Sequence, residues 1–228
     1  MQNFILLHGA LGSSDDLAGL SRVLKMSGNT VFSFSFSGHG KQAFQTAFGI
    51  EQFASELENF VAKNEIKNPI VFGYSMGGFV ALHLAAKHKN FLKKIITLGT
   101  KFNWSKESVE KETRMLNPET MLEKIPGFAK GLENKHGAEW KELVTKTADM
   151  MREIHEKNFL NPDLIKSLEM PVLLGLADND QMVSLEETRA IVKELPGATM
   201  YMLPKSKHAM ESVDVNLLAQ IIFNFVAL

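Results

Sequence analysis

Short apolar runs alternate along the chain with longer segments in which apolar residues recur at every third or fourth position. The short runs predict buried β-strands, and the longer periodic segments predict amphipathic helices. Strands and helices that alternate in this way favour a mostly parallel sheet with helices on both of its faces. The strands are predicted at residues 3–8, 30–36, 69–74, 94–99, 171–176 and 199–203.

Helices are predicted between and after these strands. They span residues 15–27, 50–64, 76–88, 184–195 and 213–226. The fourth begins with Ser184 and has Glu187 three residues later, which is the pattern of a capping box. Residues 31–36 alternate between apolar residues and serine, which is typical of a strand near the edge of a sheet.

One segment, residues 101–169, separates the fourth and fifth strands and is too long for a simple crossover. Within it, residues 139–157 predict a helix with one apolar face. That face carries Trp140, Leu143, Val144, Met151 and Ile154. We therefore expect a single domain, residues 1–228, with residues 101–169 forming a helical cap inserted between the fourth and fifth of six strands.

The composition excludes several classes of protein. Of the 228 residues, 45% are hydrophobic, which is ample for a core, and the net charge of −1 without a basic cluster indicates neither a nucleic-acid nor a membrane partner. The absence of cysteine excludes disulfides, thiolate metal sites and a cysteine nucleophile. The first apolar run, residues 4–7, is too short for a signal peptide, so we expect a cytoplasmic protein.

Ser75 is the candidate nucleophile. It stands in the run Gly-Tyr-Ser-Met-Gly at positions 73–77, which fits G-x-S-x-G. Chance would produce such a match in roughly one chain of this length in ten, so its context matters. The run follows a predicted strand and precedes a predicted helix, as a nucleophile elbow requires. The alternative is a glycine-rich turn without chemistry.

An acyl-transfer site also needs two backbone N–H groups that point at the developing oxyanion. The residue after the nucleophile, Met76, is expected to supply one of them. The loop after the first strand, His-Gly-Ala-Leu-Gly at positions 8–12, is expected to supply the other. Ala10 is the preferred donor and Leu11 the alternative, while His8 is expected to brace the loop.

His208 is the candidate base among the seven histidines. It follows the last strand, and sites in open parallel sheets form beyond the carboxyl ends of the strands. The order serine, acid, histidine along the chain also fits. His39 follows a strand too, but it precedes Ser75 and is expected to be a loop histidine.

Four further histidines are not expected to take part. His83 and His88 lie on the helix after Ser75 and are expected to point away from the strand ends. His136 and His155 lie within residues 101–169 and are expected to be solvated.

The acid that orients the histidine must come from the loop after the fifth strand, Ala-Asp-Asn-Asp-Gln at positions 177–181. This loop contains both Asp178 and Asp180. The chemistry of the residues does not choose between them, because either one could be a turn residue instead.

On these residues the chain resembles the α/β-hydrolase superfamily from end to end, with residues 101–169 as the divergent part. The resemblance is carried by H-G-A-L-G at 8–12, S-G-H-G at 37–40, G-Y-S-M-G-G at 73–78, D-N-D-Q-M-V at 178–183 and K-H at 207–208. It implies an α/β-hydrolase fold. Many members have two further strands before the first one here, so the sheet is expected to have six.

The resemblance implies that Asp180 is the acid. Members often begin this strand with proline and continue with G-x-x-D-x-x-V. Here Pro171 begins the strand, Val183 follows Asp180 at the family spacing, and Ala177 replaces the usual glycine. Menaquinone-pathway lyases of the superfamily share two of the runs but usually carry arginine where Phe79 stands, so Phe79 argues against that activity.

The expected activity is hydrolysis of an ester or thioester of a small, mostly apolar substrate, through an acyl-enzyme on the triad Ser75, Asp180 and His208. The same triad could instead perform C–C hydrolysis, lyase or acyl-transfer chemistry, or belong to a slow ligand-binding signalling protein. Neither a cofactor nor a metal is expected, and the oligomeric state stays open. Some large residues of the insert are expected to roof the pocket, from among Phe102, Trp104, Met115, Met121, Phe128, Trp140, Met150 and Met151.

Overall fold

The computed structural model describes residues 1–228 and contains one six-stranded sheet in the order β2-β1-β3-β4-β5-β6. Every neighbouring pair is parallel, which confirms the predicted architecture. The strands are β1 (Asn3–Leu7), β2 (Thr30–Ser33), β3 (Ile70–Tyr74), β4 (Lys94–Leu98), β5 (Val172–Ala177) and β6 (Thr199–Leu203). All six lie where the sequence predicts them, and β2 is an edge strand.

The order of the strands reverses between β1 and β3, since the chain first adds β2 on one side and then continues on the other. At this point Leu7 pairs with Gly73, so the carboxyl ends of the two strands lie side by side. A crevice for ligands forms at such a switch point in open parallel sheets.

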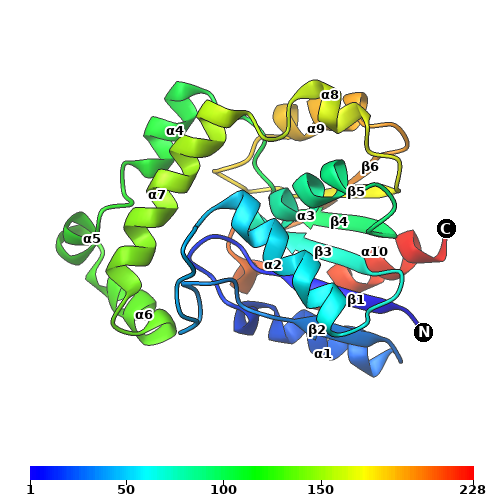
Figure 1. Ribbon diagram of the computed structural model, residues 1–228, viewed down its shortest axis with the longest axis horizontal. Helices are drawn as coiled ribbons and strands as arrows, with labels where there is room; N and C mark the ends of the chain where they lie inside the picture. Colours follow the sequence, from blue (N-terminus) through cyan, green and yellow to red (C-terminus); the bar gives the residue numbers. More distant parts are fainter.

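Helices cover both faces of the sheet (Figure 1). On one face lie α1 (Ala18–Met26) and α10 (Val215–Ala227), which pack against each other. On the other lie α2 (Ile50–Lys63), α3 (Met76–Lys87), α8 (Pro162–Lys166) and α9 (Leu185–Glu194). Each layer buries its own apolar cluster, as the continuous apolar strands require.

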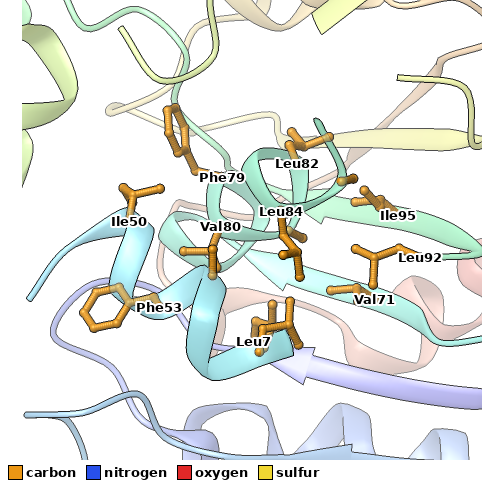
Figure 2. Close-up of a cluster of buried hydrophobic side chains, with 14 of the residues drawn as sticks. Leu7, Ile50, Phe53, Val71, Phe79, Val80, Leu82, Leu84, Leu92 and Ile95 are labelled. Carbon is orange, nitrogen blue, oxygen red and sulfur yellow. The ribbon is translucent and has the colours of Figure 1, made fainter. Parts of the chain in front are cut away.

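Helix α3 lies in the middle of the larger cluster (Figure 2). Nearly all of its residues are buried, whereas the helices at the surface have one apolar face. Val80 and Leu84 of α3 belong to the same buried cluster as Val71 of β3 and Ile95 of β4. This packing fixes the start of α3, where Ser75 lies, against the middle of the sheet.

The segment between β4 and α8 forms four helices: α4 (Lys106–Thr113), α5 (Pro118–Lys124), α6 (Pro126–His136) and α7 (Trp140–Lys157). They lie together beyond the carboxyl ends of the strands (Figure 1). They share a small apolar cluster of Met121, Ala129, Leu132, Trp140 and Val144. We refer to residues 101–169 as the insert.

The boundaries differ from the predictions at a few places. The helix predicted at residues 15–27 begins as a 3-10 turn, η1 (Ser14–Leu17), and continues as α1. The last helix begins later than predicted because the carboxylate of Asp214 accepts the Asn216 and Leu217 N–H groups and caps it; the short 3-10 turn η2 (Met210–Ser212) precedes it. None of the helices combines the length and apolarity needed to span a bilayer.

Candidate active site

Ser75 lies at a sharp turn between β3 and α3. Its φ of 50° and ψ of −116° fall outside the conformations that side-chain-bearing residues favour. The turn is held from the next strand, because the Ser75 N–H donates to the Leu98 carbonyl at 2.8 Å and the Thr100 hydroxyl donates to the Ser75 carbonyl at 3.0 Å. A strained strand-to-helix turn of this kind exposes the serine hydroxyl above the sheet.

Glycines make this turn possible. A Cβ atom on Gly73 would lie 2.3 Å from the backbone nitrogen of Gly78, and one on Gly77 would lie 2.5 Å from the Leu7 carbonyl oxygen. No side chain fits at either distance. The glycines therefore allow β1, β3 and the start of α3 to approach one another closely.

The side chains of Ser75, His208 and Asp180 lie in a continuous hydrogen-bonded row. The His208 Nε2 atom is 3.2 Å from the Ser75 Oγ atom, and Nδ1 is 2.8 Å from the Asp180 Oδ2 atom. The other carboxylate oxygen of Asp180 accepts the N–H groups of Met182 and Val183. Burial raises the pKa of Asp180, but His208 and these two donors outweigh it, so the pKa of this carboxyl lies below its usual value.

The second candidate acid, Asp178, does not reach the histidine. Its carboxylate accepts the Lys205 N–H at 2.8 Å and the Ser206 N–H at 3.0 Å. These backbone donors lower the pKa of Asp178. Asp178 thus holds the loop that leads to His208, and Asp180 alone contacts the ring.

The loop after β1 lies directly against the serine, since a Cβ atom on Gly9 would be 3.2 Å from the Ser75 Cβ atom. The N–H groups of Ala10 and Leu11 have no acceptor within the protein. Met76 is the first residue of α3, so its N–H has no intrahelical acceptor. Ala10 and Met76 line one cavity together with Ser75, and Leu11 remains the alternative donor.

Two residues that support the site were missed by the sequence analysis. The Tyr74 hydroxyl donates to the His208 carbonyl at 2.8 Å. Gly99 has a φ of 63°, and a Cβ atom there would lie 3.1 Å from the His208 ring. Tyr74 ends β3 and Gly99 follows β4, and this position at the carboxyl end of a strand is the only sequence signal that could have indicated them.

The remaining histidines are mostly buried. His8 braces the loop as predicted, because its Nε2 accepts the Phe36 N–H and its Nδ1 donates to the Gly9 carbonyl. Burial lowers the pKa of His8 to about 4. The prediction that His136 is solvated was wrong, because it is 4% exposed, whereas His155 is exposed as expected.

Two cavities meet at Ser75, and both are also lined by Ala10 and His208. The smaller, of about 30 Å³, is enclosed mainly by apolar side chains, among them Ile50 and Phe79. The larger, of about 430 Å³, lies between the loop after β1 and the insert. A third cavity of about 260 Å³ adjoins the smallest one, and Phe79 lines both.

The large residues of the insert divide between these cavities and its interior. Those that line a cavity are Phe102, Trp104, Met115, Met121, Phe128, Met150 and Met151. Met121 also belongs to the apolar cluster of the insert, as does Trp140. The insert therefore contributes side chains to the walls of both cavities at Ser75.

Comparisons with known proteins agree with this fold. The family model described as the alpha/beta hydrolase fold matches residues 2–147. Ethanol acetyltransferase 1 of Hanseniaspora uvarum is 29% identical over 93 residues, which are 39% of this chain and only 27% of that protein. The uncharacterized hydrolase YugF of Bacillus subtilis is 20% identical, and the match covers 99% of this chain and 90% of YugF.

Solved structures share the whole fold. The esterase EaEST of Exiguobacterium antarcticum superposes with a TM-score of 0.81 and 16% identity, covering 100% of this chain and 92% of the esterase. A thermophilic esterase of Thermogutta terrifontis gives a TM-score of 0.80 and 19% identity, with 100% and 90% covered. At these identities the likeness establishes the fold, and the chemistry rests on the geometry around Ser75.

Proposed function

Because the chain belongs to the alpha/beta hydrolase fold family, we propose that it is a serine hydrolase that cleaves a carboxylic ester with a small, apolar acyl group through an acyl-enzyme. The observation that carries this proposal is the row Ser75, His208 and Asp180, joined at 3.2 and 2.8 Å at the end of a strained turn. Such a row supplies a nucleophile, a base and the group that orients the base.

In the first half of the reaction, the His208 Nε2 atom takes the proton of the Ser75 hydroxyl while the Ser75 Oγ atom attacks the ester carbonyl carbon. The carbonyl oxygen becomes an oxyanion, which the N–H groups of Ala10 and Met76 stabilise. Asp180, held ionised by its donors, stabilises the positive imidazolium. The C–O bond then breaks, and the imidazolium gives its proton to the leaving alcohol.

In the second half, His208 removes a proton from a water molecule, which attacks the acyl carbon of the ester formed on Ser75. A second oxyanion forms in the same place and collapses, and the Ser75 oxygen recovers its proton from His208. The products are a carboxylic acid and an alcohol. Two moderate barriers thereby replace one high barrier.

The cavities support a small acyl group. The enclosed cavity of about 30 Å³ has room for only about two water-sized groups, and apolar side chains form most of its wall. The cavity of about 430 Å³ is more open to solvent and accommodates the alcohol, which must leave before water enters. We propose that the insert acts as a cap over both cavities.

This function is tested by the hydrolysis of p-nitrophenyl acetate, butyrate and octanoate. We expect turnover that is fastest for the acetate, and loss of about 10³-fold or more in kcat for Ser75→Ala. Ser55→Ala, on the exposed face of α2, is the matched control and should retain full activity. Full activity in Ser75→Ala, or no turnover of any ester by the wild type, would contradict the proposal.

Acyl transfer to an alcohol is a second candidate, and the partial similarity to Ethanol acetyltransferase 1 favours it. In that reaction an alcohol in the larger cavity replaces water in the second half. Adding ethanol to the p-nitrophenyl acetate assay and measuring ethyl acetate against acetate separates the two. A product that is mainly acetate at all ethanol concentrations would exclude transfer as the main activity.

A further inference from the structure

His136, the last residue of α6, is buried and uses both of its ring nitrogens. Its Nδ1 atom accepts the Gly40 N–H at 3.0 Å, and its Nε2 atom lies 2.9 Å from the Leu11 carbonyl oxygen. Since Nδ1 accepts, the ring proton must be on Nε2, which donates to Leu11. The insert therefore holds a carbonyl of the loop that carries the proposed oxyanion donor.

That loop contains an unfavourable backbone conformation. The Gly12 N–H donates to the Gly9 carbonyl at 3.1 Å and closes a four-residue turn. Leu11, its third residue, has a φ of 57°, in the left-handed region that favours glycine or asparagine. A branched, apolar residue persists there only when its surroundings impose the conformation. The hydrogen bond from His136 to the Leu11 carbonyl is such a constraint.

The insert holds the loop in two more ways. The Lys135 ammonium group contacts both carboxylate oxygens of Asp16, at 2.6 and 2.9 Å, and Asp16 in turn accepts the Ser13 N–H. The Leu11 side chain packs against the apolar cluster of the insert. A polar bond and an ion pair at the end of α6, together with this apolar contact, thus tie residues 9–16 to the insert.

We infer that His136 is a positioning residue for the oxyanion site: by holding the Leu11 carbonyl, it fixes the turn at residues 9–12 and with it the Ala10 N–H. The inference rests on the proposed serine-hydrolase function. On this account, the oxyanion site is complete only while the end of α6 is docked on the turn at residues 9–12. The insert then controls catalysis through the loop as well as roofing the cavities.

The test compares three variants on p-nitrophenyl acetate. His136→Leu removes the bond to Leu11, and we expect kcat to fall about 10- to 100-fold with KM changed less than about threefold, because donor geometry changes while the substrate cavities stay. His136→Gln retains an N–H donor near the position of Nε2 and should recover most of kcat. His88→Leu, at the exposed end of α3, is the matched control and should behave as the wild type.

Hydrogen exchange provides a readout that does not depend on turnover. In His136→Leu, amides of residues 9–17 should exchange faster, while those of β3 and β4 should not. His136→Gln should resemble the wild type at residues 9–17, whereas the Gly40 amide, which loses its Nδ1 acceptor in both variants, should exchange faster in both. Unchanged kcat and unchanged exchange in His136→Leu would overturn the inference. Equal losses in Leu and Gln variants with faster exchange throughout the protein would also overturn it, because they indicate general destabilisation.

Failure of the proposed function gives a different result. If the wild type turns over no ester and its Ser75 does not react with a fluorophosphonate, the proposed function is contradicted. The catalytic part of the inference is then contradicted with it. Faster amide exchange confined to residues 9–17 in His136→Leu would still support the contact between the insert and the loop. Unchanged exchange at these residues would refute that contact as well.

Discussion

Asp178 and Asp180 stand two residues apart with similar chemistry, yet the geometry gives them separate roles. Asp180 contacts the His208 ring at 2.8 Å, whereas Asp178 accepts backbone N–H groups of the loop after β6, which leads to His208. Both aspartates lie in one turn, which the hydrogen bond from the Asp180 N–H to the Ala177 carbonyl closes at 3.1 Å.

Replacing each aspartate by asparagine separates these roles. Asp180→Asn keeps the shape but places a neutral group beside the imidazolium and can impose the wrong tautomer on His208, so we expect kcat to fall by about 10³- to 10⁴-fold. Asp178→Asn keeps an acceptor for the loop and should cost less than about tenfold. The measurement is kcat on p-nitrophenyl acetate, and equal losses in the two variants would contradict the assignment.

Some residues of the site could be predicted from the sequence and others could not. Ser75 and His208 follow from local signals, namely the elbow motif and a position after a strand. Asp180 needed the resemblance to a family, because both aspartates satisfy the local pattern. Tyr74 and His136 act through backbone groups 134 and 125 residues away, and no local pattern encodes such contacts.

At the scale of elements, α3 forms a wall between two cavities. Phe79, in its first turn, lines both the cavity of about 30 Å³ at Ser75 and the neighbouring one of about 260 Å³. Phe79 is apolar and carries no charge that could bind a carboxylate, so the wall at this point is apolar.

Phe79→Ala should join these two cavities and lengthen the acyl chain that the enzyme accepts. We expect the ratio of kcat/KM for p-nitrophenyl octanoate over acetate to rise about tenfold or more, with a loss of about 3–5 kcal/mol in stability. Met115→Ala, in the larger cavity, is the control and should leave this ratio near its wild-type value. A ratio unchanged in Phe79→Ala would show that the acyl chain binds elsewhere.

Replacing helix glycines by alanine tests how closely α3 must approach the sheet. A Cβ atom on Gly78 would lie 2.1 Å from the Thr100 Oγ1 atom, whereas one on Gly19 in α1 would lie 3.7 Å from Val215. We expect Gly78→Ala to destabilise the protein by about 1–3 kcal/mol or more and Gly19→Ala to stabilise it by about 0.5–1 kcal/mol. Urea unfolding measures both, and a stable Gly78→Ala would refute the close contact.

The strands and most helices could be predicted because each carries a periodic apolar pattern that is decided locally. The insert could be predicted as helical, but its docking could not. It depends on polar contacts between distant segments, such as the ion pair of Lys135 with Asp16 and the bond from Phe102 N–H to Glu187. Such pairs leave no periodic signal in the sequence.

At the scale of the whole molecule, four histidines are buried in their neutral form. Their burial determines how the stability of the fold depends on pH. Burial lowers the pKa values of His8, His39, His83 and His136, with that of His8 falling to about 4. Well above pH 6.5, neither the folded nor the unfolded chain protonates these rings. Below it the unfolded chain binds protons that the folded chain does not, so acid favours unfolding.

We therefore expect the free energy of unfolding to be constant above about pH 7 and to fall as the pH drops from about 6.5 toward 4. His8 alone contributes about 3 kcal/mol of this loss by pH 4, from the size of its pKa shift. Urea unfolding at pH 7.5, 6 and 5 measures the effect. A free energy that does not change between pH 7.5 and 5 would contradict the neutral burial of these rings.

The central claim is that Ser75 is the nucleophile of the whole arrangement, and covalent labelling tests it most directly. The wild type is treated with a fluorophosphonate, digested, and analysed by mass spectrometry for the modified peptide. We predict one adduct per chain on Ser75, blocked in Ser75→Ala and greatly slowed in Asp180→Asn. An unlabelled wild type, or a label on any other residue that persists in Ser75→Ala, would contradict the account.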